Sequence, residues 1–220
     1  MSADGTALGD LRRQADACTA CPLAQTRTRV VFGEGDPHAR LLLVGEAPGQ
    51  QEDLQGRPFV GAAGRLLDRI LEAVDIAREE VFITNTVMCR PPGNRVPTDA
   101  ERATCRPYFD RKMVLSAPRI VVLLGATAAR QVLGPEVRIT RDRGRPVERD
   151  GVTYVPTFHP AALLRDPEKK RPVWEDMKRV RDLYRALPPL SGPVPAAPAA
   201  NQARLALDGP GAPRPTPPAP

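Results

Sequence analysis

The side chains of this chain that could carry out chemistry fall into two groups, one polar and aromatic and one made of cysteines. The first group lies on or just beyond apolar runs that are typical of buried strands, and it comprises Glu46, Glu52, Phe59, Asn85 and His159. In open α/β sheets the carboxyl ends of parallel strands meet at one edge, and ligands bind there. We therefore expect these side chains to lie together.

The residue types in this group suit the recognition of a pyrimidine base. The side chain of Asn85 offers one acceptor and two donors, which match the O4 and N3–H edge of uracil. Phe59, which we expect to be exposed, can stack on the base. His159 can donate to O2 of a leaving base as negative charge develops there. Taken singly, the ordinary explanation is a strand-end cap for Asn85, a core residue for Phe59 and a turn residue for His159. Their common placement favours a site instead.

The four cysteines form the second group. Cys18 and Cys21 form a C-x2-C pair on one turn, whereas Cys89 and Cys105 are single and have fifteen residues between them. In a cytoplasmic protein such residues are more often metal ligands or catalytic groups than disulfides. A zinc ribbon prefers two C-x2-C pairs, and a cubane iron–sulfur cluster takes four thiolates from scattered loops. The spacing favours iron–sulfur, with zinc and unrelated cysteines as the alternatives.

Composition indicates the compartment and the class of partner. The net charge is +6, and 28 of the 32 basic residues are arginine, whose planar fork suits phosphate. A genome-wide arginine bias would give the same count, so this observation only leans toward nucleic acid. No apolar run approaches the roughly 20 residues that span a bilayer, and the N-terminus lacks the pattern of a signal peptide. We expect a cytoplasmic protein.

The elements that must position these residues can be read from the apolar patterns. Strands are expected at 41–45, 80–87, 119–125 and 152–158, and helices at 4–17, 63–74, 126–133 and 172–187. Thr98 and Glu101 predict the start of a further helix, and residues 138–149 a β-ribbon or loop. The alternation predicts an α/β fold with a parallel sheet.

The composition changes at Pro188. Residues 188–220 hold 11 of the 26 prolines and almost no charge, so we expect a disordered Pro/Ala-rich tail that follows one domain over residues 1–187. Within the tail, residues 202–207 loosely resemble the short peptides that bind bacterial sliding clamps, which makes the clamp a candidate partner.

Three segments carry a resemblance to a known family. GEAPGQQEDLQGRPFVGAAG at 45–64, TNTVMCRPPGNRVPT at 84–98 and TFHPAALLR at 157–165 are similar to the signature segments of family 4 uracil-DNA glycosylases, the iron–sulfur class. The resemblance covers about residues 10–187. It implies a monomer with a three-layer α/β/α fold, a central, mostly parallel four-stranded sheet and a [4Fe–4S] cluster. The implied cluster ligands are Cys18, Cys21, Cys89 and Cys105.

The resemblance also implies an activity, in which uracil is flipped out of DNA and its N-glycosidic bond is hydrolysed to leave an abasic site for base excision repair. Backbone amides at Gly45, Glu46 and Ala47 would contact the base and Phe59 would stack on it. Asn85 would read the uracil edge, and His159 would stabilise the uracil anion.

The resemblance implies further roles around this pocket. Leu163 or Leu164 would wedge into the duplex with Arg165 near a phosphate. The loop between Cys89 and Cys105 would present arginines to the DNA backbone, namely Arg90, Arg95 and Arg106. Some relatives carry an aspartate where this chain has Ala47 and use it to position the water. Glu46 is therefore our first candidate for that role and Glu52 our second.

Two other functions compete with this interpretation. One is a non-catalytic iron–sulfur module that binds DNA with the same basic face, which Ala47 favours and the intact segments around Asn85 and His159 disfavour. The other is a superfamily relative that traps the abasic sugar covalently through a histidine on a basic loop. The only other histidine, His38, lies far from that position in the sequence, which disfavours this second alternative.

Overall fold

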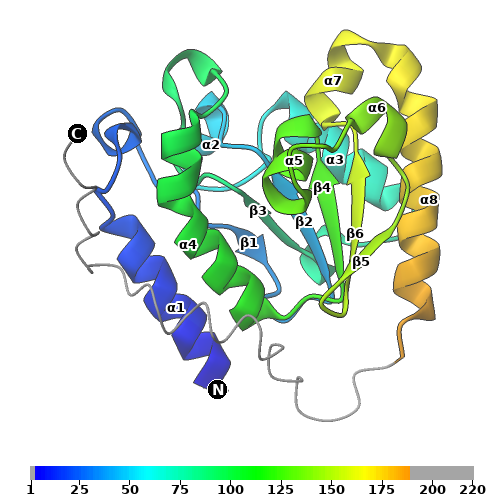
Figure 1. Ribbon diagram of the computed structural model, residues 1–220, viewed down its shortest axis with the longest axis horizontal. Helices are drawn as coiled ribbons and strands as arrows, with labels where there is room; N and C mark the ends of the chain where they lie inside the picture. Colours follow the sequence, from blue (N-terminus) through cyan, green and yellow to red (C-terminus); the bar gives the residue numbers. More distant parts are fainter. Residues whose placement is uncertain (1–2, 189–220) are drawn as a thin grey trace, which may run out of the picture.

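A six-stranded sheet forms the centre of the computed structural model, which describes residues 3–188 (Figure 1). The strand order is β1-β3-β2-β4-β6-β5. The strands are β1 (Glu34–Gly35), β2 (Leu41–Gly45), β3 (Phe82–Asn85), β4 (Ile120–Leu124), β5 (Val147–Arg149) and β6 (Val152–Thr157). The four inner strands run parallel, and the short outer strands β1 and β5 pair antiparallel with β3 and β6.

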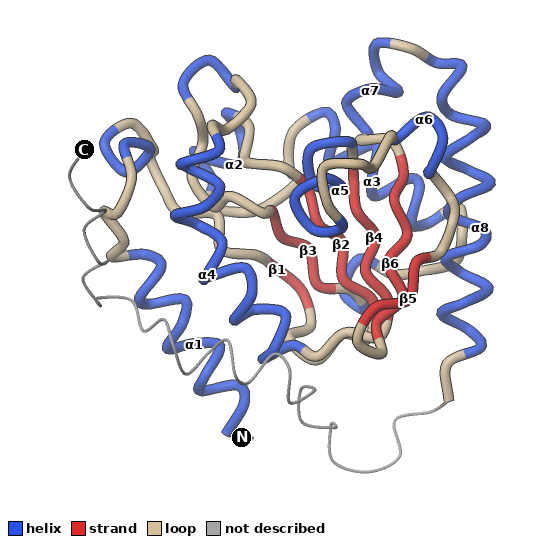
Figure 2. The backbone as a smooth tube through the Cα atoms, in the orientation of Figure 1, coloured by secondary structure: helices blue, strands red, loops and turns tan. Residues whose placement is uncertain are grey.

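Helices cover both faces of this sheet, as the tube view shows (Figure 2). The α-helices are α1 (Ala3–Asp16), α2 (Gln50–Gln55), α3 (Ala62–Glu72), α4 (Asp99–Ser116), α5 (Ala126–Leu133), α6 (Ile139–Asp142), α7 (Pro160–Arg165) and α8 (Lys170–Ala186). Four short 3-10 helices complete the connections, namely η1 (Pro22–Gln25), η2 (Arg78–Glu80), η3 (Pro92–Asn94) and η4 (Pro167–Lys169).

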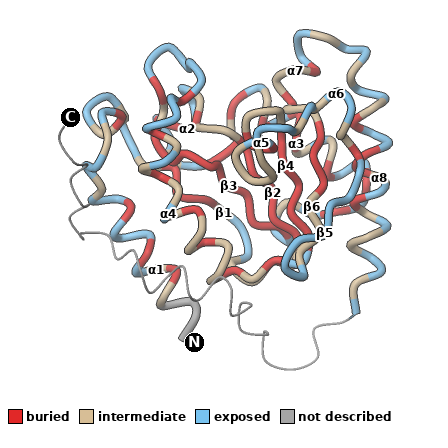
Figure 3. The backbone as a smooth tube through the Cα atoms, in the orientation of Figure 1, coloured by how far each residue is buried: buried red, intermediate tan, exposed pale blue. Residues whose placement is uncertain are grey.

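The sheet separates two hydrophobic cores because neighbouring residues of a strand point to opposite faces. Leu41 and Leu43 of β2 pack with α3, α7 and α8, whereas Leu42 and Val44 pack with α1, α4 and α5. All five residues of β2 and of β4 are buried (Figure 3). Continuous apolar strands of this kind are typical of parallel sheets that are covered on both sides, and the three-layer α/β/α class is confirmed.

The predicted strand number was too low. The four expected strands form the parallel centre of the sheet, but β1 at one edge was missed, and β5 at the other edge was expected only within a β-ribbon or loop over 138–149. β1 has two residues and β5 has three, all three exposed, so neither contains an apolar run that a sequence pattern would reveal. Residues 138–149 contain the short helix α6 as well as β5, and the connection between β2 and α3, for which no element was expected, contains α2.

The predicted start of the helix at Thr98 is confirmed as the N-terminus of α4. The amide of Glu101 donates to Oγ1 of Thr98 at 3.2 Å, and the amide of Thr98 donates to Oε2 of Glu101 at 2.7 Å. This reciprocal capping box satisfies two amides that the helix itself cannot pair. It also fixes the direction in which the preceding loop enters the helix.

Three predictions concern residues outside the described range. They are the disordered tail, the clamp-binding segment at 202–207 and the part of the domain boundary that follows residue 188. None of the helices within residues 3–188 is long and apolar enough to span a membrane.

Candidate active site

A cavity of about 490 Å³ opens at the carboxyl ends of β2, β3, β4 and β6. Its wall includes all five residues of the first group, Glu46, Glu52, Phe59, Asn85 and His159. The prediction that they lie together is confirmed. They come from four separate segments of the chain, and the parallel sheet brings these segments to one edge.

Gly45, the last residue of β2, creates space for two of the wall residues. A Cβ atom at this position would lie 2.3 Å from Oδ1 of Asn85 and 2.7 Å from Cζ of Phe59. Any larger residue would therefore displace both side chains. Behind Gly45, the carbonyl of Glu46 accepts hydrogen bonds from the amide of Val87 at 3.0 Å and Oγ1 of Thr86 at 2.9 Å, which fixes the backbone beside Ala47.

Asn85 ends β3 and is 2 % exposed. Its Oδ1 atom is buried and, among the described residues, has no hydrogen-bond partner. A buried acceptor left unpaired costs about 1–3 kcal/mol, so such atoms are rare in native proteins. Because the side chain also borders the cavity, this oxygen can accept a hydrogen bond from a group that enters it.

Phe59 is buried, with 6 % of its surface exposed, so the expectation of an exposed aromatic was wrong. It has a φ of 52°, which is uncommon for a non-glycine residue. The close approach of α3 explains the burial, because a Cβ atom on Gly64 would lie 1.9 Å from the Phe59 carbonyl oxygen. The ring packs into the core below and borders the cavity above.

His159 immediately precedes α7, and its Nδ1 atom accepts a hydrogen bond from the amide of Ala161 at 3.1 Å. This bond makes Nδ1 an acceptor, so in the neutral ring the proton is on Nε2. Burial and, as a smaller effect, the positive charge of Arg165 together lower the pKa of His159 to about 4. The imidazole is therefore neutral at pH 7 and presents one N–H donor.

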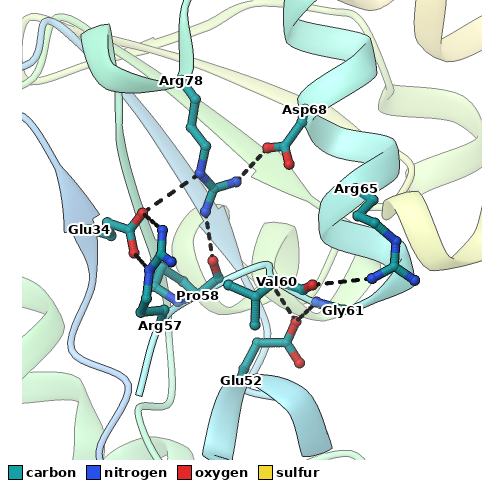
Figure 4. A network of polar contacts seen from close by, with 9 residues as sticks. All are labelled: Glu34, Glu52, Arg57, Pro58, Val60, Gly61, Arg65, Asp68 and Arg78. Carbon is teal, nitrogen blue, oxygen red and sulfur yellow. Dashed lines mark hydrogen bonds and ion pairs between the residues drawn. The ribbon is translucent and has the colours of Figure 1, made fainter. Parts of the chain in front are cut away.

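Glu52 of α2 holds the loop that carries Phe59 (Figure 4). Its Oε1 atom accepts hydrogen bonds from the amides of Val60 at 2.9 Å and Gly61 at 2.8 Å. One oxygen of this carboxylate is thus committed to the backbone. Glu46 lies in the cavity wall directly after β2, which leaves it as the first of the two acidic candidates.

An ion-pair network holds the same loop from the other side, and no sequence pattern predicts it (Figure 4). Arg78 donates to the carbonyl of Pro58 at 2.8 Å and to Asp68 at 2.6 Å. Arg57 makes two hydrogen bonds to Glu34, at 2.6 and 2.8 Å. These partners are 10 to 23 residues apart, and no periodicity relates them.

The three residues assigned to DNA from the sequence lie in α7. Leu163 is 1 % exposed and packs in the core, so its assignment to the DNA surface was wrong. Leu164 is 47 % exposed. Arg165 is exposed and borders the cavity. α7 has only six residues, too few for a sequence pattern to show which leucine faces inward.

The three arginines expected to face DNA, two from the loop before α4 and one from α4 itself, have partners within the protein. Arg95 makes two hydrogen bonds to Glu101, at 2.7 and 2.8 Å, and Arg106 pairs with Asp110 at 2.6 Å. Arg90 donates to Oδ1 of Asn94 at 2.7 Å. The charges of Arg95 and Arg106 are therefore largely neutralised, and these two residues hold the loop and α4 in place.

The four cysteines line one small pocket between the end of α1 and the start of α4. Burial raises the pKa of Cys105 to about 11 and also raises the pKa of Cys89. Arg27 opposes the second effect, because its Nη1 atom lies 3.3 Å from Sγ of Cys89. Within residues 3–188, no three His, Cys, Asp or Glu side chains lie close enough to hold a single metal ion.

Comparisons with known proteins agree with this geometry. A family model described as the uracil DNA glycosylase superfamily matches residues 32–178. A type-4 uracil-DNA glycosylase of Thermotoga maritima is 45 % identical over 172 residues, which cover 76 % of this chain and 90 % of the relative. Proteins of the same name from Sulfurisphaera tokodaii and Archaeoglobus fulgidus are 41 % and 40 % identical. These alignments each cover 80 % of this chain, and 84 % and 92 % of the relatives.

Proposed function

Because this chain belongs to the uracil DNA glycosylase superfamily and, within it, to the type-4 uracil-DNA glycosylases, we propose that it removes uracil from DNA. The uracil nucleotide leaves the stack and enters the cavity, and water cleaves the bond between C1′ and the base to leave an abasic site. The observation that carries this proposal is the unpaired, buried Oδ1 atom of Asn85 in the cavity wall.

Asn85 discriminates between bases by its hydrogen-bonding pattern. Its Oδ1 atom accepts N3–H of uracil, and its amide group donates to O4. In this orientation, cytosine would place the N3 acceptor against Oδ1 and the N4 donor against the amide group. Cytosine would then leave buried groups unpaired, which disfavours binding strongly.

His159 stabilises the leaving base. As the glycosidic bond lengthens, negative charge develops on O2 of uracil, and the Nε2–H group of the neutral ring donates to it. A fixed donor aimed at developing charge in a site that excludes water is an effective form of catalysis. Because Ala161 holds the ring through Nδ1, no reorganisation of the histidine is needed.

The sugar acquires oxocarbenium character in the transition state, and a nearby carboxylate both stabilises it and orients the water. We assign this role to Glu46 first and Glu52 second. Both border the cavity, but one Glu52 oxygen holds the amides of Val60 and Gly61. Ala47 has no group that could perform the role.

Leu164 supports the extrusion step. It is exposed on α7 beside Arg165, so it can fill the position that the flipped nucleotide leaves, with the guanidinium near a phosphate. DNA is the partner in this proposal, and the protein would act as a monomer in the cytoplasm. Binding of residues 202–207 to a sliding clamp stays a prediction, which a pulldown with the tail peptide would test.

The residues of the cysteine pocket fit a [4Fe–4S] cluster. All four thiols line one enclosed space, and a single zinc ion would need each sulfur within about 2.3 Å of one point. When bound, the cluster would cross-link the chain through four iron–thiolate bonds. Cys18 and Cys21 would thereby be tied to Cys89 and Cys105, so the N-terminal segment would be anchored to α4 and the role would be structural.

A glycosylase assay tests the proposal. The substrate is a labelled oligonucleotide with one uracil, and alkali then cleaves the strand at abasic sites. We expect cleavage with the wild type and losses of roughly a hundredfold for Asn85→Ala and His159→Ala. His38→Ala is the matched control and should retain activity. A cluster-loaded wild type that leaves the strand intact would instead favour the non-catalytic DNA-binding module.

A further inference from the structure

The loop that precedes α4 carries an apolar side chain at the mouth of the cavity. We call residues 91–98 the rim loop. Within it Val96 is 56 % exposed, and it borders the cavity. An exposed valine alone is ordinary on a protein surface. A valine at the mouth of a ligand cavity, on a loop that is fixed from several sides, requires a reason.

Hydrogen bonds fix the rim loop so that Val96 keeps its position. The buried carboxylate of Glu101 accepts two bonds from Arg95 and one from the amide of Thr98. Arg95 also donates to the carbonyl of Val96 at 3.1 Å. The backbone on both sides of Val96 is therefore held, and its β-branched side chain has few rotamers.

A second exposed apolar residue lies on α7, whose Ala161 and Arg165 border the same cavity. Figure 1 shows the rim loop above the end of α4 and α7 across from it, both at the carboxyl edge of the sheet. Leu164 of α7 is 47 % exposed. Val96 at the cavity and Leu164 on α7, next to the cavity residue Arg165, are thus two exposed apolar side chains on the same edge of the protein.

We propose that Val96 is a second apolar wedge, which packs against the base next to the extruded nucleotide and, with Leu164, keeps the vacated stack open. This inference rests on the proposed function. Valine has no polar group with which to read a base, and the charge of neighbouring Arg95 is held by Glu101. Contact with the flat face of an unstacked base is the interaction that such a side chain can provide.

The test compares paired with unpaired uracil. We would measure kcat/KM for Val96→Ser and Val96→Ile on a single-stranded oligonucleotide and on the matching duplex. Val96→Ser should lower the duplex value about five- to tenfold, as expected when part of a valine loses its apolar cover. The single-strand value should change less than about twofold, and Val96→Ile should preserve both.

Val147→Ser is the matched control, because Val147 is a 37 % exposed valine on β5 that does not border the cavity. It should change neither value. An equal loss on both substrates with Val96→Ser would overturn the inference, because the valine would then contact the extruded nucleotide itself. An unchanged duplex value would also overturn it.

A second readout is independent of bond cleavage. A 2-aminopurine base beside the uracil becomes fluorescent when it loses its stacking partner, so it reports opening of the stack on binding. Val96→Ser should weaken this signal, and an unchanged signal would overturn the inference. If the wild type opened the stack but did not cleave, the proposed function would fail while the wedge was still tested.

Discussion

The rings of Phe59 and His159 lie with their centroids 5.5 Å apart and their planes 30° from parallel. A base between them would need about 3.5 Å on each side, so it does not fit in this arrangement. In the proposed function, uracil would therefore lie outside this pair of rings and not between them. Phe59 also covers one face of the imidazole, and this cover contributes to the desolvation that keeps His159 neutral.

The pH dependence of excision should reflect the pKa of His159, which burial and then the charge of Arg165 lower to about 4. We expect kcat/KM to be insensitive to this group from pH 8 down to about pH 5, and to fall near pH 4. An acid limb at pH 6.5 would contradict the neutral donor. The stability of the folded protein should also decrease as the pH falls from 6.5 to 4. In this range the unfolded chain binds a proton at His159 that the folded chain does not.

Gly45→Ala should abolish recognition of uracil without unfolding the protein. The added methyl group would lie 2.3 Å from Oδ1 of Asn85 and 2.7 Å from Cζ of Phe59, so both must move out of position. We expect a loss of excision of about a hundredfold or more. Gly151→Ala is the control, because nothing lies within 4 Å of its Cβ position and its positive φ makes it cost about 1 kcal/mol in stability alone.

Two glutamine variants should separate the roles of the acidic residues. Glu46→Gln removes the negative charge near the sugar, and we expect kcat to fall about a hundredfold or more. Glu52→Gln keeps an oxygen that can accept from Val60 and Gly61, so it should lose less than about tenfold. The reverse order, measured in single-turnover assays, would reassign the water to Glu52.

Glu101→Gln should destabilise the protein by about 2 kcal/mol, because it weakens charge-assisted hydrogen bonds to a buried carboxylate. Arg95, together with Thr98, lowers the pKa of Glu101 to about 2. The contribution is therefore complete above about pH 4.5 and disappears as the pH falls through 2. The difference in the free energy of unfolding between wild type and variant, measured with urea, should be smaller at pH 3 than at pH 7.

Glu175→Gln provides the comparison for this measurement. Glu175 forms an exposed ion pair with Lys178 on α8, and exposed pairs of this kind contribute little to stability because water screens them. An equal loss of stability in both variants would mean that the buried network around Glu101 contributes no more than an exposed ion pair does.

Removal of the proposed cluster by a chelator under oxidising conditions should loosen the N-terminal segment and leave the sheet intact. We expect faster hydrogen exchange for amides of residues 17–27, which lie beside the cysteine pocket. The amides of β2 serve as the internal control, because both of their neighbours are central strands. Equal acceleration in β2 would mean that the cluster supports the whole fold rather than this segment.

The central architecture could be predicted because it depends on local patterns. The apolar runs that became β2, β3, β4 and β6 are each continuous, and their ends bring Glu46, Asn85 and His159 to one edge. The helix cap could be predicted for the same reason, since Thr98 and Glu101 are three residues apart in the sequence.

Features that depend on distant contacts could not be predicted. Phe59 is buried because α3 approaches at Gly64, and no pattern around residue 59 records that approach. Only the packing of α7 decides that Leu163 faces inward and Leu164 outward. The pair formed by Arg57 and Glu34 joins segments 23 residues apart, and either residue alone resembles an ordinary surface charge.

The bracing of the rim loop by Glu101 has a mechanical consequence. Because the mouth of the cavity is rigid, the DNA must deform for the uracil to enter. The energy barrier to entry is therefore set by how strongly the uracil is paired and stacked in the DNA. Uracil opposite guanine, or near a flexible pyrimidine–purine step, is released more readily than uracil in a well-stacked pair with adenine. The enzyme would then repair weak points in the helix first, without any need to recognise the opposite base.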